Sequence, residues 1–221
     1  MRKLILKMSV SVDGFVGGVN NESDWIFVSM DEGATDWTMQ SIWQAGVHIM
    51  GSRTFHDMAS YWPSSNEVYA APMNEIPKVV FSKNPQVTSQ EARATTRSVR
   101  DASNSSGAKE AAARKDAPPA DPSKEQSWRN ARVMSGDLAT DIGQLKSEPG
   151  KDIMAHGGAS FARSLVRLGL VDEFQLLVHP FVLGQGLPIF SELPKRIALR
   201  LVSASTFPSG AAAHVYRPKV E

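Results

Sequence analysis

The sequence predicts a three-layer α/β domain with a mixed, mostly parallel central sheet and helices on both faces. Over most of the chain, short apolar segments alternate with segments whose apolar residues recur at helical spacing. Glycine turns follow several of the apolar segments, as expected where a parallel strand leads into a helix. The last part of the chain holds strand patterns with no helix pattern between them, which adds antiparallel strands to the sheet.

Composition places the chain among ordinary globular proteins. Of its 221 residues, 42% are hydrophobic and 21% are charged, and the formal net charge is +1. This balance gives no electrostatic reason to expect nucleic acid or an anionic membrane as a partner. The sequence has no cysteine, no apolar stretch long enough for a membrane span and no signal-peptide pattern. We therefore expect a single cytoplasmic domain over residues 1–221.

The first strand is expected over residues 4–12, ending at Asp13 and a glycine-rich loop. A helix is then expected from Ala34, closing at Gly46. Its apolar face holds Met39, Ile42, Trp43 and Gly46.

A short strand over residues 47–50 leads into a second helix, which Ser52 can cap at its start. Arg53 in the first turn is unfavourable against the helix dipole, so its presence makes sense if an anion lies between them. An arginine simply exposed to water is an equally good interpretation. Tyr61-Trp62-Pro63 ends this helix.

The next strand is expected over residues 77–83. Ser82 and Lys83 could extend an anion site, or could mark only the turn of a strand end into solvent. From about residue 84 to 130 the composition changes to Ser, Ala, Arg, Lys, Asp and Pro, which indicates a low-complexity surface insertion. Within it, residues 107–114 could form a helix and residues 117–122 should be extended or disordered.

Order resumes with a strand over residues 131–136 and a helix that Asp137 can cap and Gly150 ends. The apolar face of this helix holds Leu138, Ile142 and Leu145. A strand, the Gly157-Gly158 turn and a helix follow. The apolar face of this second helix holds Phe161, Leu165 and Leu168, and Gly169 is its expected stop. Three strands are then expected over residues 172–180, 198–205 and 212–217, the last as an antiparallel edge.

Two glycine turns fall at the carboxyl ends of parallel strands, where α/β sheets bind ligands. They are Gly51-Ser52-Arg53-Thr54 and Gly157-Gly158-Ala159-Ser160. Each would present free backbone N–H groups and a helix N-terminus to an anion such as phosphate. The alternative is that each is only a tight turn.

Five motifs, in this order, resemble one known family. They are SVSVDGF at 9–15, IMGSRTF at 49–55, VVFSK at 79–83, IMAHGGA at 153–159 and VLGQGLPIF at 182–190. Together they resemble the dihydrofolate-reductase-like family, which includes the C-terminal reductase domain of the bifunctional riboflavin-biosynthesis enzyme. The resemblance covers nearly the whole chain outside the insertion.

The resemblance implies an NADPH-dependent reductase that transfers a hydride to a small heterocycle of the pterin, dihydrofolate or ribosylaminopyrimidinone type. The residues that it places at the cofactor are Gly51, Ser52, Arg53, Thr54, Ser82, Lys83, Gly157, Gly158, Ala159, Ser160 and Phe161. Arg53 and Lys83 can form ion pairs with a 2′-phosphate, which argues for NADPH over NADH.

On the substrate side, Asp36 is the positional match to the acidic residue with which dihydrofolate reductases hold the pteridine. A solvated carboxylate in the first turn of a helix is the alternative. Asp13 and Trp62 are expected to line the pocket, although a tryptophan in this position is often a core residue. The arginine that binds the folate tail in the family has no counterpart before strand 77–83, which argues against folate.

The five histidines are scattered without ligand spacing, so no metal is expected. The family analogy and the apolar terminal strands suggest a homodimer. A second hypothesis, of a different class, is a non-catalytic dinucleotide-binding or oligomerising module that keeps the fold without turnover.

Overall fold

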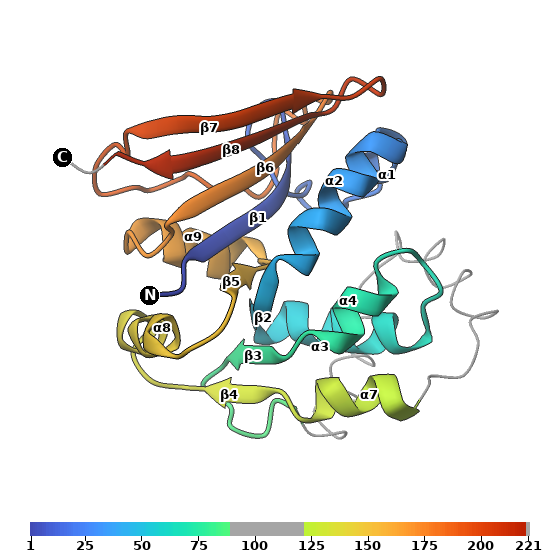
Figure 1. The fold of residues 1–221 in the computed structure, drawn as a ribbon. Coiled ribbons are helices and arrows are strands. Elements are labelled where there is room, and N and C mark those ends of the chain that lie inside the picture. The colour runs from blue at the N-terminus through green and yellow to red at the C-terminus, as the bar shows by residue number, and fades with distance from the viewer. Residues whose placement is uncertain (89–121, 220–221) are drawn as a thin grey trace.

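The computed structural model describes residues 1–88 and 122–219. Its centre is a sheet whose strands follow the order β4-β3-β2-β5-β1-β6-β8-β7 (Figure 1). The strands are β1 (Leu4–Ser11), β2 (Ala45–Gly51), β3 (Lys78–Phe81), β4 (Arg132–Met134), β5 (Asp152–Ala155), β6 (Glu173–His179), β7 (Leu199–Thr206) and β8 (Ala212–Pro218). The first six in spatial order pair in parallel, and β8 and β7 are antiparallel.

Helices cover both faces of this sheet (Figure 1), which confirms the expected three-layer α/β fold class. The helices are α1 (Trp25–Val28), α2 (Glu32–Trp43), α3 (Ser52–Tyr61), α4 (Ala70–Glu75), α7 (Pro122–Arg129), α8 (Leu138–Ser147) and α9 (Ala159–Arg167), with a 3₁₀ turn, η1, at Trp62–Ser64. Because β5 is apolar on both sides, and β1 presents Leu4 and Leu6 to one face and Ile5 to the other, each layer of helices finds a hydrophobic surface to bury.

One core lies between the sheet and the pair α8 and α9. Alternate residues of each strand point into it because side chains change face at every step along a strand. Its central members are Leu4, Leu6, Ile49, Val79, Ile142, Leu145, Ile153, Ala155, Ala162 and Leu165. The second core lies on the other face, under α2, α3, α4 and α7. Its central members are Ile5, Ile42, Met50, Phe55, Met73, Val80, Trp128 and Met154.

The segment around Trp128 corrects the expected extent of the insertion. Residues 122–129 form α7, and the Trp128 side chain is fully buried against Phe55. Its indole Nε1 donates a hydrogen bond to Asn74 Oδ1 at 2.8 Å, and its ring lies 4.5 Å from Lys78 Nζ. A single large aromatic residue therefore anchors a stretch whose average composition is polar. The expectations for residues 107–114 and for 117–121 lie outside the described residues.

Three details of the expected elements are wrong. Gly46 belongs to β2 rather than to the end of α2, and Trp43 is 40% exposed. The buried face of α2 is instead Ala34, Thr38, Ser41 and Ile42. Likewise Leu168 is 54% exposed, because α9 turns Ala162, Leu165 and Val166 toward the sheet.

The third correction concerns the edge of the sheet. The strand expected over 212–217 is β8, which pairs with β6 on one side and with β7 on the other. The antiparallel edge is therefore β7.

No helix in the described ranges is both long and apolar enough to span a lipid bilayer.

Candidate functional site

The two glycine turns singled out in the sequence lie next to each other at the carboxyl edge of the sheet. Gly51 N donates a hydrogen bond to Gly157 O at 3.4 Å, which joins the turn from β2 to α3 with the turn from β5 to α9. A cis peptide bond links Gly157 to Gly158. A Cβ atom on Gly158 would lie 2.9 Å from Thr54 Oγ1, so only glycine fits there without a shift. The structure thus brings together both halves of the expected anion site.

The first turns of α3 and α9 leave their backbone N–H groups available to a ligand. The N-cap residues are Gly51 and Gly158, and among the described residues no side chain caps either helix. Neither first turn contains an acidic residue. In contrast, Asp31 caps α2 and Asp137 caps α8 through hydrogen bonds to backbone amides. The expected capping by Ser52 is therefore wrong, because Ser52 is the first residue of α3. Uncapped helix starts are suitable anion-binding sites.

Charged and aromatic residues flank these helix starts. Arg53 is exposed in the first turn of α3. The Phe81 and Phe161 rings, 5.1 Å apart, bring the exit of β3 beside the start of α9. Ser82 Oγ accepts a hydrogen bond from the next turn, and Lys83 Nζ donates to the carbonyl oxygens of Ser135 and Gly136 at 2.9 and 3.1 Å. The ammonium of Lys83 therefore extends toward the exit of β4.

Asp13 holds a neighbouring loop in place. Its carboxylate accepts hydrogen bonds from Ser11 Oγ at 2.6 Å and from the backbone N–H groups of Leu183 and Gly184. The hydrogen bond from Ser11 is the largest cause of the lowered pKa of Asp13. These contacts hold the loop after β6 against the exit of β1. They give Asp13 a structural role that requires no bound ligand.

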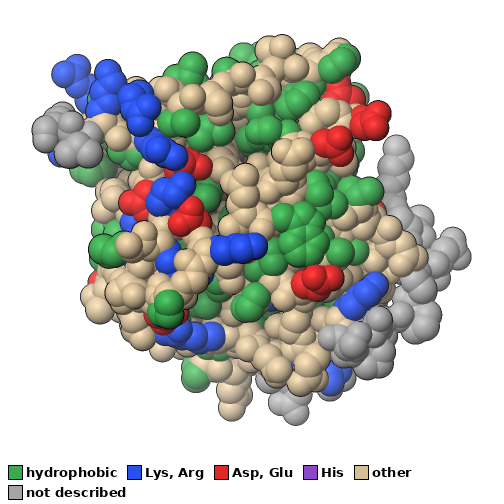
Figure 2. Space-filling model, viewed as in Figure 1, with side chains coloured by type: hydrophobic (Ala, Val, Ile, Leu, Met, Phe, Trp, Pro, Cys, Tyr) green, Lys and Arg blue, Asp and Glu red, His purple; other side chains and the backbone are tan. Residues whose placement is uncertain are grey.

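Beside the glycine turns, a cleft of about 510 Å³ opens between β1 and the helices α1, α2 and α4. Its size is in the range typical of small-molecule sites. Figure 2 shows hydrophobic side chains gathered in the region of α2 and α4. The residues that line the cleft are Lys7, Ser9, Ile26, Phe27, Met30, Thr35, Thr38, Asn66, Glu67, Val68 and Tyr69.

Lys7 is the residue in this cleft that sequence reasoning missed. It lies on β1, on the face opposite to Leu6, and its Nζ lies 5.5 Å from the centre of the Trp37 ring. Burial lowers the pKa of Lys7 from 10.5 to about 8, because the low-polarity surroundings disfavour the charged form. Within residues 1–88 and 122–219 it has no carboxylate partner. A lysine inside a largely apolar first strand was the signal that could have found it.

The two other residues expected at the substrate do not line this cleft. Asp36 is exposed, whereas its neighbours Thr35 and Thr38 line the cavity. Trp62 lies in η1, with its ring centre 6.5 Å from that of Tyr69, so it supports a cleft residue from behind. No contact in the structure supports the substrate-binding roles predicted for Asp36 and Trp62.

A pair of histidines, one buried and one partly buried, lies on the same face of the sheet as Lys7. The rings of His48 on β2 and His156 after β5 are 4.3 Å apart in an edge-to-face arrangement. Burial, followed by the nearby Lys7 charge, lowers the pKa of His156 to about 3, and burial also lowers the pKa of His48. Both rings are therefore neutral near pH 7. In the part of the chain that the structure describes, no group of three possible metal ligands occurs.

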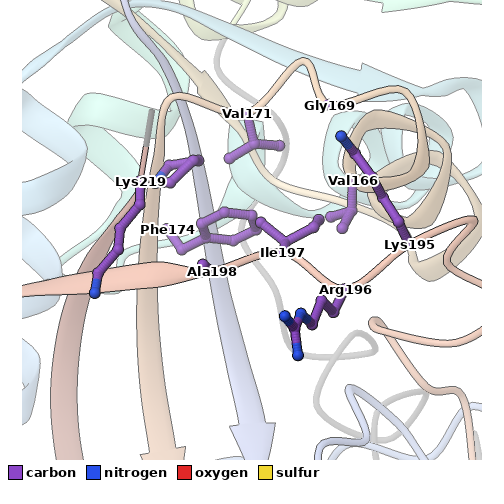
Figure 3. Close-up of a pocket in the computed structure, with 10 residues that line it drawn as sticks. Val166, Gly169, Val171, Phe174, Lys195, Arg196, Ile197, Ala198 and Lys219 are labelled. Carbon is purple, nitrogen blue, oxygen red and sulfur yellow. The ribbon is translucent and has the colours of Figure 1, made fainter. Parts of the chain in front are cut away.

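A second, smaller cavity of about 230 Å³ lies at the opposite end of the sheet, where β6 begins (Figure 3). Phe174 and Ile197 form its apolar floor. The charged ends of Lys219 and Arg196 extend away from these two side chains (Figure 3). This cavity lies at the amino end of the parallel strands, so we place the candidate site at the other end.

Comparisons with known proteins identify the family of this chain. The sequence profile of the RibD C-terminal domain matches residues 2–213. The uncharacterized protein YyaP of Bacillus subtilis is 32% identical over 215 residues, which cover 97% of this chain and 94% of YyaP. A pyrimidine reductase-like protein from Corynebacterium diphtheriae has a TM-score of 0.62 at 14% identity, with 100% of this chain and 93% of that one covered. Dihydrofolate reductase from Enterococcus faecalis, in complex with NADP(H), has a TM-score of 0.55 at 10% identity, with 99% and 97% covered.

The fold and the match to the RibD C-terminal domain define a dihydrofolate-reductase-like domain of the reductase type. Within that class, the chain belongs to the RibD C-terminal domain family. The family resemblance expected from the five sequence motifs is confirmed.

Proposed function

We propose that this protein is an NADPH-dependent reductase that transfers a hydride to a C=N or C=O bond of a small heterocycle. The observation that carries the proposal is the pair of adjoining helix starts, α3 and α9, which meet no capping side chain among the described residues. A dinucleotide pyrophosphate has the charge and the length to accept N–H groups from both.

The residues at this edge fit the cofactor. Gly158 has no room for a Cβ atom beside Thr54, so this turn needs glycine to hold the start of α9 against α3. Arg53 is exposed beside the amides of α3 and would pair with a 2′-phosphate. Ser82 would add a hydroxyl group from the exit of β3, and Lys83 would bring a second cation to the same phosphate.

Residues of the cleft would hold the substrate and supply a proton. The bound cofactor provides the hydride, which the carbon of the C=N or C=O bond accepts. The nitrogen or oxygen of that bond then needs a proton. Because its pKa is about 8, the Lys7 ammonium can donate this proton near neutral pH and regain one from water. We propose Lys7 for this role in place of Asp36, which is exposed outside the cleft lining.

The test is NADPH oxidation in the presence of a panel of dihydrofolate, pyrimidinone and quinonoid substrates. Oxidation that depends on one of these substrates and is lost in Lys7→Met supports the proposal. NADPH binding with no oxidation across the panel would contradict it. That result would favour the non-catalytic dinucleotide-binding module instead.

A further inference from the structure

The charge of the cleft indicates which form of a heterocycle it takes. Of the described residues that line it, only Lys7 and Glu67 carry a formal charge, so the lining is neutral overall. Glu67 is already engaged, because its carboxylate accepts a hydrogen bond from the Tyr61 hydroxyl. A phosphate monoester carries a charge of about −1.5 to −2 at pH 7 and is bound where several cations or free helix starts meet it.

The helix beside the cleft is closed to such an anion. Thr35 of α2 lines the cavity, but the N-terminus of α2 is capped by Asp31, whose carboxylate accepts from Ala34 N at 2.8 Å. Glu32 adds a second negative charge in the first turn. A phosphate near this helix start would meet two carboxylates, whereas α3 and α9 at the cofactor edge have none in their first turns.

The remaining surface suits a flat ring. Ile26, Phe27, Met30, Val68 and Tyr69 contribute apolar surface. The side chains of Phe27 and Val68 are 67% and 58% exposed, so a planar ligand would remove apolar area from water. Lys7, Ser9 and Thr35 then provide a few polar groups that can orient a ring carbonyl or ring nitrogen.

We propose that the substrate is an unphosphorylated, planar heterocycle that presents a carbonyl or ring-nitrogen acceptor to Lys7. The proposal rests on the proposed function for the identity of the cleft, and it excludes phosphoribosyl and other phosphorylated forms of the same rings. Neutral hydroxylated substituents fit the cleft, since Asn66 and Thr35 can hydrogen bond to them.

The test is equilibrium binding, measured by calorimetry on the full chain saturated with NADP⁺. Two matched pairs serve as probes: 5-amino-6-(ribitylamino)uracil with its 5′-phosphate, and 6-hydroxymethyl-7,8-dihydropterin with its diphosphate. We expect the unphosphorylated member of at least one pair to bind at least tenfold more tightly than its partner. Equal or tighter binding of the phosphorylated members, or no binding of any probe, would overturn the proposal.

Two variants sharpen this measurement. Glu67→Lys adds two units of positive charge at the rim of the cleft. It should tighten binding of the phosphorylated members and so reduce the ratio of the two dissociation constants in each pair severalfold. Glu75→Lys makes the same change at the exposed end of α4 and serves as the matched control. Equal effects of the two variants would contradict a local charge effect.

The outcome is separable from the reductase assay. If the binding preference holds while NADPH is never oxidised, the proposed function fails and the assignment of the cleft stands. If NADPH is oxidised only with phosphorylated substrates, the proposed function stands and this inference fails.

Discussion

At the scale of single residues, the activity proposed for the cleft depends on Lys7. A partly buried ammonium without a carboxylate partner in the described chain is destabilising, and this cost is reflected in its lowered pKa. An acceptor on a bound ligand would relieve the cost. The residue is therefore suited to binding and proton donation and poorly suited to stabilising the empty protein.

The first prediction concerns the pH dependence of Lys7. The ammonium form is present below pH 8 and is lost as the pH rises through about 8, so kcat/KM should fall above that pH. Lys7→Met should lower kcat/KM by about 10²-fold, the low end for loss of a general acid, and should remove this alkaline limb. Steady-state kinetics from pH 6 to 10 would measure both effects. An unchanged alkaline limb in the variant would show that another group is responsible.

The same shift has a consequence for stability. The folded pKa lies below the unfolded value of 10.5, so the unfolded chain binds more protons between pH 8 and 10.5 and stability rises with pH across that interval. Lys7→Met should accordingly raise the melting temperature at pH 7 while it reduces turnover. A variant that is destabilised at pH 7 would contradict the described environment.

A second prediction at this scale concerns Arg53. Removing a guanidinium that pairs with the 2′-phosphate should weaken NADPH by about tenfold or more, the range for a charged hydrogen bond, and should leave NADH nearly unchanged. Fluorescence titration of Arg53→Ala with both nucleotides would measure this. Arg200→Ala, on the exposed edge strand β7, is the control. Equal losses for the two nucleotides would refute the assignment.

At the scale of elements, the paired turns before α3 and α9 were recognisable in the sequence because both follow strands and both contain glycine. Their contact can be tested with a double-mutant cycle. Gly158→Ala should destabilise the protein by about 1–3 kcal/mol through overpacking, because its Cβ would lie 2.9 Å from Thr54 Oγ1. The double variant Gly158→Ala with Thr54→Ala should recover much of that loss in urea denaturation. Strictly additive effects would show that the two turns are not in contact.

Helix α7 provides the second element-scale prediction. Trp128→Ala should reduce the free energy of unfolding by about 3–5 kcal/mol, the usual cost of truncating a buried tryptophan. Trp128→Phe should cost less, since it keeps most of the packing and loses only the hydrogen bond to Asn74. Urea denaturation of both variants tests the order. A negligible effect of Trp128→Ala would mean that α7 is dispensable for the fold.

The glycine turns, Trp128 of α7 and Lys7 of β1 show what sequence patterns can and cannot predict. The strand-glycine-helix order predicted the positions of Gly51 and Gly157 because it depends on local backbone chemistry. Trp128 was missed because window composition averages one aromatic residue into a polar stretch. Lys7 was missed as a site residue because its importance depends on α1, α2 and α4 closing over it, which is a tertiary effect.

At the scale of the whole molecule, the sequence predicted the fold class, since alternating strand and helix patterns followed by strands alone define few topologies. The order of the last two strands could not be derived, because the residue pattern of a strand does not specify which strands lie beside it. The substrate residues could not be predicted from the sequence either. Asp36 and Thr35 are neighbours in the chain, and the helical rotation between them decides which side chain faces the cleft.

The exposed edge strand β7 carries the whole-molecule prediction. Leu201 and Val202 are 51% and 39% exposed on an unpaired edge, a surface that proteins commonly cover. We expect a homodimer in solution, detectable by light scattering after size-exclusion chromatography. Leu201→Lys should shift it toward the monomer, and a monomeric unmodified protein at micromolar concentration would contradict the expectation.

Asp31 connects this edge of the molecule to the candidate substrate cleft. One carboxylate oxygen caps α2 at Ala34, and the other accepts a hydrogen bond from Ser209 N at 2.9 Å, in the turn between β7 and β8. Phe207 of the same turn packs against Gly33. The turn of the β7–β8 hairpin thus holds the start of α2, which lines the cleft, in place. We therefore expect that assembly or truncation, if it displaces the hairpin, changes the affinity of the cleft for its substrate through Asp31.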